Sequence, residues 1–113
     1  MENRIHTIKT KSDLNNYLKN YKFIVMKFTA TWCGPCKQIN PSFENYFMQL
    51  PEDFICIIVD IDEGKSLANA LRVKSVPTIM NYIDGVCKDI TVGANEDALF
   101  SFFKKTLESY RSV

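Results

Sequence analysis

The sequence holds two cysteines three positions apart, Cys33 and Cys36, with Gly34 and Pro35 between them and Trp32 in front. A thiolate breaks a disulfide by attacking one of its sulfurs, and a second thiol nearby can then displace the captured partner. This spacing predicts a redox-active dithiol, and the position of Cys33 ahead of the predicted helix makes Cys33 the attacking thiol and Cys36 the resolving one.

The residues around the pair predict a strand, a short loop and then a helix. Residues 23–28 form an apolar run, and apolar side chains recur every three or four positions after Cys33. Cys33 is thus expected at or just before the helix N-terminus, where unpaired N–H groups and the helix dipole favour a thiolate. Pro35 fits the first turn, and Cys36 lies one turn on, within reach of a disulfide. Pro41 inside this helix predicts a kink.

A metal site and a pair of inert buried thiols are the alternatives for the cysteine pair. A structural zinc site needs about four ligands. Only Cys56, Cys87 and His6 remain as further candidates, and they include no second closely spaced pair. Redox chemistry is therefore favoured. Cys56, inside an apolar run, is expected to act as a small hydrophobe, and Cys87 as an exposed surface thiol, with an intermolecular disulfide as its alternative.

Strand and helix periodicities alternate along the rest of the chain. Strands are expected at residues 4–8, 23–28, 54–60, 78–83 and 86–92, with a tight turn at Asp84-Gly85 joining the last two. Helices are expected after the N-cap residues Ser12 and Asn95, from Cys33, and over residues 65–71. This order predicts an α/β fold in which a central mixed sheet of about five strands lies between layers of about four helices.

The composition fits one soluble domain spanning residues 1–113. The formal net charge is +1 with both signs interspersed, which argues against an electrostatic surface for nucleic acid or membrane. The apolar runs fall short of the roughly 20 residues that span a bilayer. The polar start, MENRIHTIKTKSD, contains no secretion signal, so we expect a reducing compartment and a cytoplasmic protein.

The segment FTATWCGPCK at residues 28–37 resembles the active-site segment of thioredoxins. The resemblance covers essentially the whole chain and continues through Pro41, VDID at 59–62, SVPT at 75–78, the turn at Gly85, and VGAN at 92–95. It implies the thioredoxin fold and an enzyme that reduces protein disulfides. It also implies that no bound cofactor or metal is needed, and that a separate thioredoxin reductase, NADPH-dependent in this family, restores the dithiol.

The resemblance also implies roles for residues outside the pair. Pro77 would be a cis-proline facing the cysteines, and with Val76 it would offer backbone groups to an extended substrate segment. An apolar lip around the attacking sulfur would consist of Trp32, Gly34, Pro35, Gly93 and Ala94. Trp32 directly precedes an expected exposed nucleophile, so it is expected on this rim and not in the core.

Lys27 departs from the family pattern. Thioredoxins usually carry a buried aspartate at this position, which relays a proton for the resolving thiol, and Ile58 replaces a polar partner of that aspartate. In one interpretation Lys27 extends to the surface and keeps its ammonium hydrated. In the other, the ammonium stays near Cys36, favours thiolates and makes the pair more oxidising, while burial favours a neutral amine that could accept a proton.

The leading hypothesis is therefore a thiol–disulfide oxidoreductase that reduces protein disulfides. The chief alternative is a thioredoxin-fold binding module or subunit with little turnover, which the loss of the usual aspartate supports. An oxidant or isomerase would need a higher reduction potential, and the lack of a secretion signal argues against it. Glutathione chemistry of the glutaredoxin type does not fit the Gly34-Pro35 pair.

Overall fold

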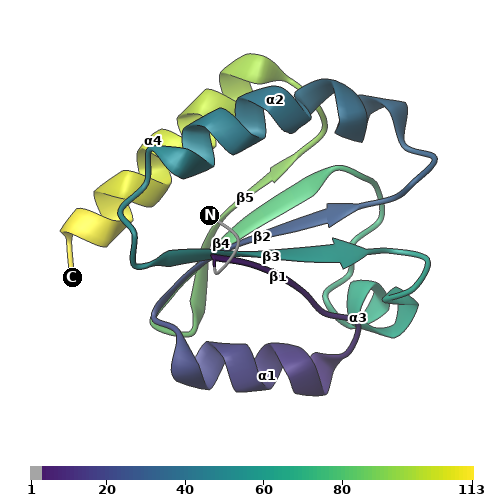
Figure 1. Ribbon diagram of the computed structural model, residues 1–113, viewed down its shortest axis with the longest axis horizontal. Coiled ribbons are helices and arrows are strands. Elements are labelled where there is room, and N and C mark those ends of the chain that lie inside the picture. Colours follow the sequence, from purple (N-terminus) through teal and green to yellow (C-terminus); the bar gives the residue numbers. More distant parts are fainter. Residues whose placement is uncertain (1–3) are drawn as a thin grey trace.

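The expected α/β fold is confirmed (Figure 1). The computed structural model describes residues 4–113, so residues 1–3 of the expected domain lie outside the described part. The elements in chain order are β1 (Ile5–Thr7), α1 (Lys11–Asn20), β2 (Phe23–Thr29), α2 (Gly34–Met48), β3 (Phe54–Asp60), α3 (Lys65–Ala70), β4 (Thr78–Ile83), β5 (Val86–Val92) and α4 (Glu96–Arg111).

The five strands form one mixed sheet in the order β1-β3-β2-β4-β5. β1, β3 and β2 are parallel, whereas β4 runs antiparallel to β2, and β5 antiparallel to β4. Helices α1 and α3 cover one face of the sheet, and α2 and α4 cover the other (Figure 1). β2 lies at the centre of the sheet, and the chain leaves it directly into the cysteine loop.

The side chains of β2 alternate between the two faces of the sheet, as in any strand. Ile24, Met26 and Phe28 join the core beneath α1 and α3. Phe23 and Val25 join the core beneath α2 and α4. Lys27, which is next in the second series, therefore enters the apolar layer between the sheet and α2.

The helix starts follow the capping residues, with one correction. Asn95 caps α4 as expected, because its Oδ1 accepts a hydrogen bond from the backbone N–H of Ala98 at 2.8 Å. The N-cap of α1 is Thr10 and not Ser12. The Thr10 hydroxyl accepts a hydrogen bond from the N–H of Asp13 at 3.0 Å. The helix therefore begins two residues earlier than it would with Ser12 as its N-cap.

The β4–β5 hairpin turns at Asp84 and Gly85, which both have positive φ, 54° and 81°. This is the expected tight turn. The pairing register then shifts, because Tyr82 faces Cys87 while Asn81 faces Asp89. This shift leaves one extra residue in β5, which interrupts the alternation of its side chains between the two faces of the sheet. Cys87 is exposed, as expected.

Candidate active site

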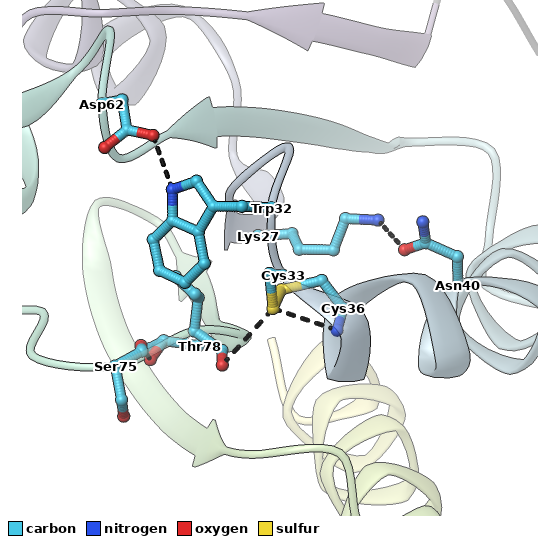
Figure 2. The surroundings of a disulfide bond; sticks show 9 residues. Lys27, Trp32, Cys33, Cys36, Asn40, Asp62, Ser75 and Thr78 are labelled. Atoms are coloured by element: carbon cyan, nitrogen blue, oxygen red, sulfur yellow. Dashed lines mark hydrogen bonds between the residues drawn. A yellow bond between two sulfur atoms is a disulfide. The ribbon is translucent and has the colours of Figure 1, made fainter.

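Cys33 and Cys36 form a disulfide at the N-terminus of α2 (Figure 2). Cys33 is the N-cap residue, and its Sγ accepts the backbone N–H of Cys36 at 3.1 Å. The two Cα atoms are 5.3 Å apart, and Pro35 occupies the first turn. The expected corner between strand and helix is thus present, and it aims a helix N–H group at the Cys33 sulfur.

The expectation of an exposed Cys33 is wrong for this disulfide form of the protein. Cys33 is 3% exposed and Cys36 is 1% exposed. The reason is that the Cys33 sulfur turns inward toward the amide of Cys36, while Ala30, Ile61 and Val76 pack around the pair. Trp32, directly before the pair, is 64% exposed and does not fill the core.

The loop before β4 faces the cysteine pair. The Val76–Pro77 peptide bond is cis, and the carbonyl oxygen of Val76 lies 3.7 Å from Cys33 Sγ. The backbone N–H of Gly93 donates to the carbonyl of Pro77 at 2.9 Å, with φ 96° at Gly93. The structure thus brings Val76, Pro77 and Gly93 to the site from segments far apart in the sequence. Ala94 packs instead against the core beneath α2 and α4.

The exposed indole of Trp32 has a partner that sequence reasoning missed. Its Nε1 donates to Oδ2 of Asp62 at 2.8 Å (Figure 2). Asp60 shapes this loop, because its Oδ1 accepts the backbone N–H groups of Asp62 and Glu63. Gly34 and Pro35 are also exposed beside the pair. In the sequence, the VDID segment at residues 59–62 is the only signal for Asp62, and it does not indicate a contact with Trp32.

Lys27 is buried behind this corner, with 6% of its surface exposed. Its Nζ donates to Oδ1 of Asn40 at 2.7 Å and lies 4.4 Å from the ring centroid of Phe43. Burial lowers the pKa of Lys27, and the Glu44 carboxylate opposes this shift. These contacts favour an ammonium held inside the protein over one that is hydrated at the surface.

The remaining thiols differ from the pair in their surroundings. Cys56 is buried in β3 as expected, and burial raises its pKa to about 12, so it stays protonated at neutral pH. The pKa of exposed Cys87 is also raised, by partial burial and by the charge of Asp89. Within residues 4–113, no cluster of three or more His, Cys, Asp or Glu side chains could hold a metal ion. No helix in this part of the chain has the length and apolar character to cross a membrane.

Comparisons with known proteins identify the family. The family model described as Thioredoxin matches residues 5–105. Thioredoxin of Geodia cydonium is 38% identical over 104 residues, covering 89% of this chain and 97% of that protein. Thioredoxin H1 of Arabidopsis thaliana is 37% identical, covering 90% of each. The crystal structure of reduced Schistosoma mansoni thioredoxin superposes with a TM-score of 0.79 at 30% identity, covering 91% of this chain and 98% of that one.

The similarity to these relatives indicates the function of the chain as well as its fold. Thioredoxins act through their own disulfide without a bound cofactor, on disulfide-containing proteins, and a thioredoxin reductase recycles them. The Cys33–Cys36 disulfide at the head of α2 supplies the same chemistry here. The chain belongs to the thioredoxin family and is a thiol–disulfide oxidoreductase that reduces protein disulfides.

Proposed function

We propose that Cys33 is the attacking thiol and Cys36 the resolving thiol. The Cys33 thiolate attacks one sulfur of a substrate disulfide, and the other substrate sulfur leaves as a thiolate that takes up a proton. Cys36 then loses its proton and attacks Cys33 Sγ, which releases the first substrate sulfur. Two electrons pass to the substrate, and the Cys33–Cys36 disulfide remains. The observation that carries this order is the 3.1 Å hydrogen bond from the Cys36 N–H to Cys33 Sγ, because it stabilises negative charge on Cys33.

The lip residues are proposed to bind the substrate segment around its disulfide. The exposed indole of Trp32 offers an apolar surface, and Gly34 and Pro35 extend it. Val76 supports binding of an extended segment, because its backbone borders Cys33 and can pair with another strand. Pro77 and Gly93, which are joined by a backbone hydrogen bond, are proposed to border the same binding surface, together with Ala94.

Lys27 is proposed to modulate the redox couple. Its side chain enters the layer between β2 and α2, the helix that begins at the cysteine pair. A cation in this layer stabilises thiolates, which exist only in the reduced protein. Lys27 thereby favours the reduced form.

We place the protein in the cytoplasm, acting in electron transport, with recycling by an NADPH-dependent thioredoxin reductase. A single domain over residues 1–113 is supported by one sheet with a core on each face.

A trapping experiment tests the order of the two cysteines. A Cys36→Ser variant lacks the resolving thiol, so we expect it to accumulate a one-to-one mixed disulfide with insulin through Cys33. Non-reducing electrophoresis and peptide mass spectrometry measure the adduct. The experiment uses Cys87→Ser protein throughout, to remove the other exposed thiol. The matched control, Cys33→Ser, should form no adduct, and an adduct through Cys36 in that control would contradict the assignment.

A further inference from the structure

The inner face of α2 places Cys36 in line with the two residues that contact Lys27. Asn40 and Phe43 follow Cys36 by four and seven positions, so all three side chains lie on one face of the helix. Lys27 reaches this face from the neighbouring strand β2, and Figure 2 shows its amine directed at the Asn40 carbonyl oxygen. The amine is thus held next to the face of the helix that carries the resolving thiol.

Both contacts of Lys27 favour its charged form. An amide oxygen accepts a strong hydrogen bond from an ammonium, and an aromatic ring attracts a cation at its face. The nearby charge of Glu44, one turn beyond Asn40, acts in the same direction, whereas burial opposes it. A buried ammonium therefore depends on Asn40 and Phe43 to stay protonated.

The partner of this ammonium is neutral. Among residues 4–113 the salt bridge is Lys9–Glu63, on the surface. The hydrogen-bond acceptor of buried Lys27 is an amide oxygen and not a carboxylate. A carboxylate at position 40 would cancel the positive charge, whereas an amide oxygen fixes the ammonium in place and leaves its field intact. An asparagine at position 40 therefore leaves the positive charge of Lys27 to act on the cysteine pair.

We propose that Asn40 is a positioning residue of the redox reaction, which holds the Lys27 ammonium against α2 so that its charge stabilises the reduced cysteine pair. This inference rests on the proposed roles of Cys33, Cys36 and Lys27. The effect is measured on the equilibrium with glutathione. In this reaction the protein disulfide and two glutathione thiols give the protein dithiol and glutathione disulfide, with transfer of two electrons. Thiolates form only on the product side of the protein, so a fixed cation shifts this equilibrium toward the dithiol and makes the protein more oxidising.

The test is a double-mutant cycle in Cys87→Ser protein. For each variant, the equilibrium constant for reduction of the protein disulfide by glutathione is measured at pH 7. Lys27→Met keeps the length of the buried stem and removes the charge, and we expect it to lower the constant about tenfold, or about 30 mV. Asn40→Ala should lower it about threefold, because the ammonium loses its acceptor and either shifts or deprotonates. When Lys27→Met is already present, Asn40→Ala should leave the constant unchanged.

Two further variants distinguish a role of Asn40 in positioning the ammonium from a role in the structure of the helix. Asn40→Asp keeps the size of the side chain and an acceptor for Nζ but neutralises the charge, so we expect about a tenfold decrease. It also provides the readout if Asn40→Ala does not fold. Asn45→Ala removes the same amide from an exposed position of the same helix and should have no effect.

Each outcome bears on a different assignment. Equal effects of Asn40→Ala with and without Lys27→Met would overturn the inference, since Asn40 would then act on the helix and not through the lysine. A shift from Lys27→Met with none from either Asn40 variant would also overturn it, while the proposed role of Lys27 stands. No shift from Lys27→Met would refute both. Failure of the parent protein to form the Cys33–Cys36 disulfide would instead contradict the cysteine assignments.

Discussion

Replacing Cys33 by serine is expected to lower the rate of insulin reduction by roughly a thousandfold or more. A serine hydroxyl stays protonated at neutral pH and cannot form the mixed disulfide, so the first step is lost. The pair supplies the electrons as well as the nucleophile, and Cys36 alone cannot close an intramolecular disulfide. The turbidity of precipitating insulin chains, with dithiothreitol as the reductant, measures the rate.

The control for this variant is Cys87→Ser, which removes an exposed thiol that lies outside the pair. It should retain the full rate, and its far-UV circular dichroism and that of Cys33→Ser should match the parent protein. Equal turnover by Cys33→Ser and the parent protein would end the proposal that Cys33 attacks the substrate.

The second large effect concerns stability and not chemistry. Asn81 in β4 is fully buried, and its Oδ1 accepts the backbone N–H groups of Lys88 and Asp89 at the irregularity in β5. Its Nδ2 donates to Oδ2 of Asp89 at 3.0 Å and to Oγ1 of Thr106 at 2.7 Å. Each buried polar group left without a partner costs about 1–3 kcal/mol. We therefore expect Asn81→Ala to lower the free energy of unfolding by about 3 kcal/mol or more.

Guanidinium unfolding of the oxidised protein measures this loss. Asn15→Ala, at an exposed position of α1, is the matched control and should change the free energy of unfolding by less than about 0.5 kcal/mol. A loss below about 1 kcal/mol for Asn81→Ala would mean that water replaces the amide, and that the side chain does not support the irregular strand.

The fold could be predicted because its determinants are local. The apolar runs of β2 and β3, the turn at Asp84 and Gly85, and the cap at Asn95 each specify their own segment of chain. The cysteine pair was predictable for the same reason, since its spacing and the start of α2 lie within a few residues. The cap of α1 was misplaced because Thr10 and Ser12 are both good capping residues, and backbone geometry selects between them.

The missed residues are polar side chains whose partners are distant in the sequence. Asp62 meets Trp32 across 30 positions, Asn40 meets Lys27 across 13, and Asn81 reaches α4 across 25. A single asparagine or aspartate in a sequence carries no sign of such a partner. For Lys27, the sequence left two positions of the ammonium open, and only the packing of β2 against α2 distinguishes them.

Competitive alkylation shows whether the sulfur held at the N-terminus of α2 is the reactive one. The fully reduced protein is treated with limiting iodoacetamide at pH 7, and each labelled cysteine is quantified by peptide mass spectrometry. A thiol with a raised pKa reacts slowly at this pH, so exposed Cys87 serves as the internal reference and Cys56, with its pKa raised to about 12, as the unreactive one. We expect Cys33 to be labelled at least about tenfold faster than Cys87. Labelling of Cys87 before Cys33, or at the same rate, would contradict the account.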